Sequence, residues 1–318
     1  MQQATTNHRL QRGFSLVELM IGTALSMMIV GAVLALLLST KVAYNDTDRL
    51  GALTESGRYT LQVLSEQLRH ADFWGAIQAS DVQPAISLAA IDSDCSGAAA
   101  GYALTTPIWA TTASSATVAS CITDAAIDSD VLFIKHVAAT ATALGSLDAS
   151  RTYIMANNIT GIIFDGADTT PSTAVGGDVP NGSAREYLAS AYYVSTSSGT
   201  PTLFRKRLLG NTWQASEEVS SGIEMVRVEF GEDTNNDGTA DRFVAPDSAA
   251  MNDVVSARLF VLARTQETDN GYTDSKTYYL GNTTVTPNDH YHRMVFQTTV
   301  NLRNRYLHIV GDPAAQGS

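Results

Sequence analysis

The sequence has little cysteine, little proline and little positive charge, and each shortage narrows the choice of structure. Among 318 residues there are two cysteines, eight prolines, and 20 lysines and arginines against 32 aspartates and glutamates. Two cysteines are too few for a disulfide-stapled scaffold or a cysteine-rich zinc site. The composition also excludes a collagen-like chain, and a hydrophobic fraction of 44% excludes a wholly disordered one.

The charge balance and the missing motifs exclude several function classes. The formal net charge is −12, and no cluster of lysine and arginine is visible. Because an acidic surface repels the phosphate backbone, we expect no nucleic-acid partner. The chain also lacks a glycine-rich phosphate loop, a nucleophile elbow and an HExxH zinc motif. We therefore expect a protein that is not an enzyme.

The strongest feature is an apolar segment near the N-terminus. Residues 14–38 contain a single charged side chain, Glu18. As a helix this segment would be about 37 Å long, enough to cross a hydrocarbon core of about 30 Å. Because His8, Arg9 and Arg12 precede it, we expect that end to stay in the cytoplasm and the rest to be exported. A cleaved secretory signal would be shorter, and a plain anchor would not explain a carboxylate inside the membrane.

Residues 12–19, Arg-Gly-Phe-Ser-Leu-Val-Glu-Leu, resemble the class III signal of type IV prepilins. In that family a membrane-embedded aspartyl peptidase cuts after the glycine and methylates the new N-terminus. The resemblance implies that residues 1–13 are a leader, cut between Gly13 and Phe14. It also assigns Glu18 to assembly, where its carboxylate would neutralise the N-terminal amine of a neighbouring subunit.

The helix is expected to continue beyond the membrane segment. Five leucines recur at helical spacing between residues 50 and 68, namely Leu50, Leu53, Leu61, Leu64 and Leu68. Such a stripe predicts that a helix over residues 14–74 packs its second half on a head domain. We therefore expect an α+β fold, in which this long helix packs on an antiparallel β-sheet head formed by residues 75–318.

The head sequence is typical of β structure. Apolar and polar residues alternate along residues 293–303, which predicts a half-buried strand with Met294, Phe296, Val300 and Leu302 on its buried face. Further strands are expected at residues 131–137, 187–195, 202–208, 224–230 and 255–261. Stretches rich in Ala, Ser, Thr and Gly at residues 138–150 and 165–184 predict loops.

Residues 291–304 look like the closing strand of PilW-type minor pilins, which prime type IV pilus assembly. The late first proline, Pro84, and the length of the chain favour a minor pilin over a major one. The resemblance implies a structural subunit that primes or caps the pilus, or fimbrium, and supports twitching motility. It also implies a single pass through the bacterial inner membrane, a periplasmic head, and later a place in the surface pilus.

The partners implied by the resemblance are other minor pilins, the major pilin and the prepilin peptidase, with a tip adhesin as a further candidate. Two alternatives stay open. A minor pseudopilin of type II secretion would share the N-terminus and a similar head. A membrane-anchored periplasmic enzyme would use the N-terminal segment only as an anchor.

One acidic segment fits the front of a calcium loop. Its oxygen ligands would be Asp233, Asn235, Asp237, the carbonyl of Thr239, and Asp241, and Gly238 would allow the sharp turn. The twelfth position is Val244 instead of glutamate, so a bidentate ligand would have to be Glu232 or a distant residue. The alternative is a solvated turn, since Asn-Asp-Gly is also a turn signal. A bound calcium ion would be structural, and no other cofactor is expected.

The two cysteines, Cys95 and Cys121, both fall in the part that we expect to be exported. In an oxidising periplasm two cysteines most simply form a disulfide. Closing a loop of this size would stabilise the head by about 3 kcal/mol in the chain-entropy description. The alternative is a pair of free, buried thiols.

Overall fold

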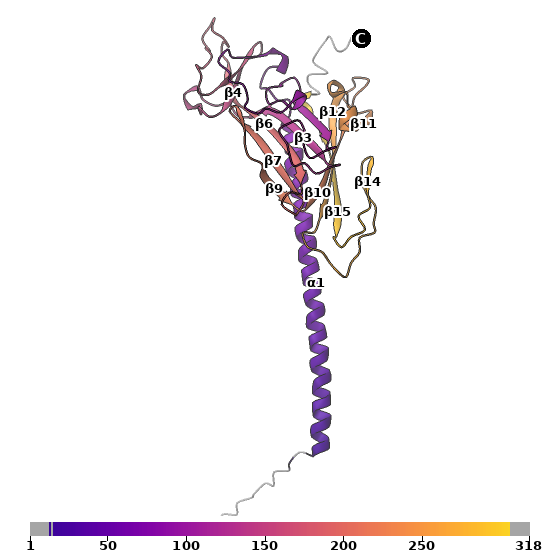
Figure 1. Cartoon of the computed structure of the whole chain (residues 1–318). Helices are drawn as coiled ribbons and strands as arrows, with labels where there is room; N and C mark the ends of the chain where they lie inside the picture. The colour runs from indigo at the N-terminus through magenta and orange to yellow at the C-terminus, as the bar shows by residue number, and fades with distance from the viewer. Residues whose placement is uncertain (1–12, 14, 306–318) are drawn as a thin grey trace, which may run out of the picture. The chain divides into compact units, whose positions relative to one another are not determined.

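The computed structural model describes residue 13 and residues 15–305. The described residues divide into two compact units, with the boundary between residues 50 and 51. A single α-helix, α1 (Leu16–His70), runs through the boundary between the units, and the strands all follow it (Figure 1).

In the first unit, α1 is exposed along its length. Its apolar stretch has a mean hydropathy of 2.4, and the helix is long and apolar enough to cross a membrane. The hydroxyl groups in this stretch are satisfied within the helix: Ser26 Oγ donates to the carbonyl of Gly22 at 2.7 Å, and Thr40 Oγ1 donates to that of Leu36 at 2.8 Å. These hydroxyl groups are thus compatible with apolar surroundings.

In the second unit, the leucine stripe of α1 packs as predicted from Leu53 onward, whereas Leu50, the first leucine of the stripe, is 42% exposed. Leu53, Leu64 and Leu68 are buried in one hydrophobic core together with apolar residues of both large sheets. Gly57 is also buried, and a Cβ atom at this position would clash with the ring of Phe296. The lack of a side chain at Gly57 therefore lets the helix approach the last strand closely.

The helix ends at His70, four residues before the predicted end. Asp72 adopts a left-handed backbone conformation with φ of 63°, which takes the chain out of the helix. The carboxamide of Asn304 donates to the carbonyl of Ala71 at 2.9 Å and to that of Arg69 at 3.3 Å, and Arg305 lies 3.7 Å from the Asp72 carboxylate. Residues that follow the last strand therefore cap the helix, because its final carbonyls have no intrahelical donors.

Three sheets form the head. The largest has nine strands in the order β1-β5-β4-β6-β3-β2, with β7 paired to β6, β8 and β9. Its strands are β1 (Val82–Pro84), β2 (Ile108–Thr112), β3 (Asp130–Val137), β4 (Thr152–Ala156), β5 (Gly161–Asp165), β6 (Ser183–Ser195), β7 (Thr202–Leu209), β8 (Thr212–Trp213) and β9 (Glu217–Ser221). Short 3-10 turns link some strands: η1 (Ala79–Asp81), η2 (Gly97–Ala99), η3 (Leu144–Ser146), η4 (Pro246–Ser248) and η5 (Met251–Asp253).

The second sheet has four strands in the order β11-β10-β12-β15, and a third is the hairpin β13–β14. These strands are β10 (Ile223–Glu232), β11 (Arg242–Val244), β12 (Val254–Arg264), β13 (Tyr278–Leu280), β14 (Thr283–Val285) and β15 (Arg293–Asn301). Among the described strands, every pairing except the parallel β1–β5 is antiparallel. The α+β prediction with an antiparallel head is therefore confirmed.

One predicted burial was wrong. Met294 was expected on the buried face of the last strand, but its side chain is 40% exposed, whereas Val300 and Leu302 are buried. Among the described strands, β15 pairs only with β12 and so forms an edge of its sheet. In an edge strand the core covers a side chain from one side only. The alternation of apolar and polar residues does not reveal which strand lies at the edge of the sheet.

The two large sheets are joined by polar contacts at the start of β3. Asp130 accepts a hydrogen bond from the Val228 amide of β10 at 2.7 Å and pairs with Arg227 at 2.8 Å. Ser129 Oγ accepts from the Val226 amide at 3.1 Å. Burial raises the pKa of Asp130 to about 6, against the opposing effect of Arg227. These contacts fix the register of one sheet relative to the other.

Candidate functional site

The predicted processing and assembly residues lie at the start of α1. Gly13 is exposed, Phe14 lies outside the described residues, and Glu18 sits in the first turn of the helix. A shallow groove on the helix surface is lined by Glu18, Gly22, Ser26 and Val30, which share one face at a spacing of four. No ion pair to Glu18 occurs among the residues that the structure describes. The Glu18 carboxylate thus lies on the apolar stretch of the helix, on the same face as the small residues Gly22 and Ser26.

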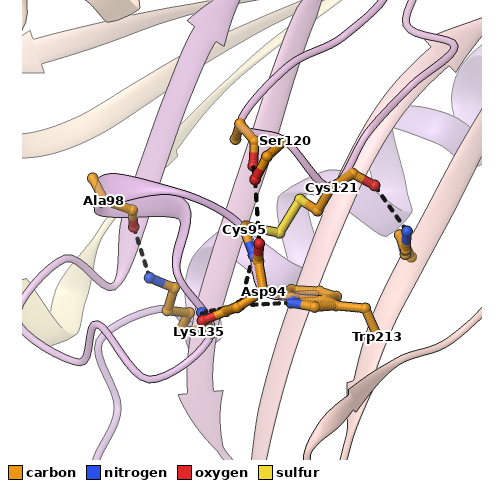
Figure 2. The surroundings of a disulfide bond; sticks show 10 residues. Asp94, Cys95, Ala98, Ser120, Cys121, Lys135 and Trp213 are labelled. Carbon is orange, nitrogen blue, oxygen red and sulfur yellow. Dashed lines mark hydrogen bonds between the residues drawn. A yellow bond between two sulfur atoms is a disulfide. The ribbon is translucent and has the colours of Figure 1, made fainter. Parts of the chain in front are cut away.

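The predicted disulfide between Cys95 and Cys121 is present in the head, with a Cα–Cα distance of 4.8 Å (Figure 2). Next to it, Asp94 accepts hydrogen bonds from the Trp213 indole at 2.9 Å and from the Gly101 amide at 3.0 Å. These bonds tie the segment at Cys95 to β8 and to its own loop. The disulfide prediction is confirmed, and the bond stands in a buried polar network.

Two lysine side chains donate hydrogen bonds to the loop that this disulfide closes. Lys206 of β7 donates to the carbonyl of Cys121 at 2.8 Å, and Lys135 of β3 donates to the carbonyls of Ala98 and Ala103 at 2.8 and 3.0 Å. The Lys135 side chain is buried, and burial lowers its pKa to about 7, while Asp94 acts in the opposite direction. Its contacts are backbone carbonyls within the disulfide loop, so Lys135 serves to position that loop.

The acidic segment after β10 is a compact turn held by its own carboxylates. Buried Asp233 accepts hydrogen bonds from the amides of Asp237 at 3.2 Å and Gly238 at 2.6 Å. Asp241 accepts from the amide and the hydroxyl of Thr234, both at 2.7 Å. The pKa of Asp237 is lowered by hydrogen bonds from Thr239, and that of Asp241 by those from Thr234. Asn236 and Gly238 have positive φ angles, which form the sharp turn.

Glu232, one of the two options suggested for a bidentate calcium ligand, has other partners in this structure. Its carboxylate is buried and accepts hydrogen bonds from Arg242 and from the Ala250 amide, both at 2.6 Å. Across the described residues, no three Asp, Glu, His or Cys side chains converge to hold a metal ion. A calcium ion here would rest on the oxygens of Asp233, Asn235, Asp237, Thr239 and Asp241 after some rearrangement of the turn.

Calcium binding by this turn stays a prediction. Calcium is expected to raise the melting temperature of the purified protein more than magnesium does, because calcium accepts six to eight oxygens in irregular geometry, whereas magnesium demands a near-ideal octahedron. The double change Asp233→Ala with Asp237→Ala should abolish the response, whereas Asp168→Ala, in a distant loop, should leave it intact. If thermal melts and calorimetry show no calcium response in the unaltered protein, the segment is only a turn.

The comparisons with known proteins match both ends of the described chain. The family described as the prokaryotic N-terminal methylation motif matches residues 8–34. The family described as type IV pilus-assembly protein W (PilW) matches residues 191–304, from β6 to the residue that caps α1. A type IV-like pilin from Thermus thermophilus is similar to the chain at 14% identity, with a TM-score of 0.37, over 79% of this chain and 97% of that one. No curated protein sequence matches significantly.

The methylation motif on an apolar helix, followed by an antiparallel β head, defines a type IV pilin-like protein. The second match is more specific, because it covers the four-stranded sheet and Asn304 of the helix cap: over residues 191–304 the chain is similar to PilW-type minor pilins. The pilin family and fold indicate a structural protein. The apolar helix and the motif are consistent with membrane anchoring and pilus assembly.

Two structural sites were missed by sequence reasoning. The Asn304–Arg305 cap and the Ser129–Asp130 link both depend on residues far apart in the chain. Neither pair forms a recognisable motif. Asn304 and Arg305 are polar residues that follow a strand, and Ser129 and Asp130 are polar residues where a strand begins. An aspartate directly before a run of four apolar residues was the one available signal, and this signal does not identify the partner of the aspartate.

Proposed function

We propose that this minor pilin primes or caps the assembly of type IV pili, after insertion in the inner membrane by a single pass with its head in the periplasm. The observation that carries the proposal is Glu18, the one charged residue of the apolar stretch 14–38, which overlaps the matched methylation motif. A carboxylate in a membrane costs several kcal/mol unless a partner charge compensates it. A processed neighbour with a free N-terminal amine would supply that charge.

The groove around Glu18 supports helix-to-helix packing. Gly22 and Ser26 follow Glu18 on the same face, and small side chains allow a second helix to approach closely. The proposed partners are accordingly other minor pilins and the major pilin, with the prepilin peptidase acting first. A tip adhesin is a further candidate that would contact the head.

A type II secretion pseudopilin is the alternative assignment. The matched head family bears the name of pilus assembly, and no feature of the head favours secretion over it. We therefore retain the pilus as the proposed system.

Deletion of the gene is expected to remove surface pili and twitching motility while leaving exoprotein secretion intact. Electron microscopy, a twitching assay and secreted-protein profiles measure the three outcomes in one strain. Complementation with the unaltered gene should restore pili. Normal pili together with lost secretion would contradict the proposal and favour the pseudopilin.

Processing should require Gly13. The change Gly13→Val is expected to leave an uncleaved chain in the membrane, whereas the unaltered protein should yield an N-terminus at Phe14. The structure offers open space around Gly13 and also around Gly31, so Gly31→Val is a matched control that should still be cleaved. Mass spectrometry of both variants shows whether the leader has been removed. Efficient maturation of Gly13→Val would contradict the assigned cleavage site.

A further inference from the structure

One backbone edge of β15 has no strand beside it in the part of the chain that the structure describes. The hydrogen bonds at the two ends of β15 show which groups lie on that edge. The Leu302 amide donates to the carbonyl of Val255 at 2.8 Å, and the Thr265 amide donates to that of His292 at 2.9 Å. Because hydrogen-bonded pairs alternate with unbonded pairs in an antiparallel ladder, the even-numbered residues of β15 are bonded to β12. The N–H and C=O groups of residues 295, 297, 299 and 301 therefore point away from β12.

This outward edge is open over residues 295–301. No hydrogen bond to its outward backbone groups occurs over this range within the described residues. At the start of the strand, by contrast, the Tyr278 hydroxyl donates to the Arg293 carbonyl at 3.4 Å. The side chains of Gln297 and Thr299 are exposed. A further strand therefore has free donors and acceptors to pair with along this edge.

The other edges of the two large sheets are protected against strand addition. β1, β8 and β11 have three residues or fewer, and β1 contains Pro84. At β2 the Asp247 carboxylate accepts a hydrogen bond from the Thr112 amide at 3.3 Å, which occupies that edge. β9 begins with two glutamates, and its pairing with β7 has a register shift. Short strands, proline, charge and irregular pairing are the means by which natural sheets prevent another strand from adding.

β15 has none of these protections. It is nine residues long, its register with β12 is regular, and it contains no proline. Between Arg293 and Arg303 the sequence carries no charged side chain. Long, regular and uncharged edges are the sites at which another strand adds, with main-chain hydrogen bonds supplying the affinity. Since the other edges are protected, the open edge of β15 indicates a surface kept for a partner strand.

We propose that this edge pairs with an extended, uncharged segment in the head of a neighbouring, different pilin, which adds a strand to the four-stranded sheet. The inference rests on the proposed function, because it identifies the head surface through which this subunit joins its neighbours. The partner segment is uncharged because the stretch between Arg293 and Arg303 offers no opposite charge to pair with it across the strands.

The direction of β15 argues against a second copy of this chain as the partner. Phe296 lies against Gly57, and Asn304 binds the carbonyl of Ala71, so β15 and α1 run in the same direction. Antiparallel pairing of two copies through β15 would set their α1 helices in opposite directions. Chains inserted in one membrane through the same N-terminal signal have the same orientation. A different pilin, in contrast, is free to offer a strand of the required direction.

Proline substitution tests the edge without removing a hydrogen bond to β12. The Gln297 amide points outward, so Gln297→Pro removes a donor from the open edge alone, and Gln297→Ala, which keeps the amide, is the matched control. Each variant replaces the unaltered full chain in the cell, and its amount in sheared pili is compared with its amount in the membrane. Gln297→Pro should enter pili at least tenfold less than Gln297→Ala, and both should melt near the temperature of the unaltered protein.

Cross-linking identifies the partner and decides the matter if Gln297→Pro melts lower. Both native cysteines are in the disulfide, so Gln297→Cys supplies a single free thiol that carries a photoreactive cross-linker. Irradiated pili should give a cross-link from this position to a β segment of another pilin, whereas Gln214→Cys, exposed after β8, should not cross-link to that segment.

The outcomes separate the pairing from the assembly role. Equal entry of Gln297→Pro and Gln297→Ala into pili that contain the unaltered protein would overturn the pairing and leave the assembly role intact. Cross-links from position 297 to a second copy of this chain, or to no pilin, would also overturn it. Absence of the unaltered protein from pili would contradict the proposed function and the pairing together.

Discussion

Replacing Glu18 by valine should leave the protein processed and inserted but reduce its incorporation into pili at least tenfold. The carboxylate is the single charge in the apolar stretch of α1, and no ion pair to it occurs within the described residues. Its charge is stabilised in a bilayer only by a partner charge, so its removal favours the isolated membrane state over the assembled one. A tenfold loss corresponds to about 1.4 kcal/mol of assembly free energy.

The measurement compares the variant in the membrane fraction with the variant in sheared pili. Thr23→Val is a suitable control, because Thr23 also lines the groove and its hydroxyl is already bonded to the carbonyl of Met20 at 3.0 Å. The control should assemble normally, which separates the loss of charge from the loss of any polar group. Equal amounts of Glu18→Val and unaltered protein in sheared pili would show that charge pairing is not needed.

Loss of the disulfide is expected to lower the stability of the head by about 3 kcal/mol. The disulfide joins residues 26 positions apart. The segment between them contains the carbonyls that accept hydrogen bonds from Lys135 and Lys206. Without the bond the unfolded chain gains conformational entropy. For a domain of this size each kcal/mol shifts the melting temperature by roughly 2–4 °C, so Cys95→Ser with Cys121→Ser should melt about 6–12 °C lower.

Thiol counting and thermal melts test this expectation together. The denatured, unreduced protein should contain no free thiol, and reduction of the unaltered protein should lower its melting temperature as the double variant does. Ser120→Ala is a matched control next to the bond, since it removes a hydrogen bond of 3.2 Å to the Asp94 carbonyl and leaves both cysteines in place. Two free thiols in the native protein, or a double variant as stable as the control, would contradict the role of the bond.

The elements that could be predicted from the sequence are those whose signal is local. A run of apolar residues without proline is sufficient for α1, since each of its hydrogen bonds joins residues four apart. Alternation with a period of two similarly identified β12 and β15, because successive side chains in a strand point to opposite faces. The cysteine pair was predictable for a different reason, namely that two cysteines in an exported segment have only each other as partner.

The sequence by itself determined the long helix, its membrane-compatible half, six of the fifteen described strands of the head and the disulfide, because local periodicity and residue counts specify them. The tertiary structure alone decided that α1 stops at His70 under the cap of Asn304, that Glu232 pairs with Arg242, and that Met294 stays partly exposed at a sheet edge. Each of these depends on which distant segments become neighbours. Strand order sets those neighbours, and no periodicity within a single segment encodes it.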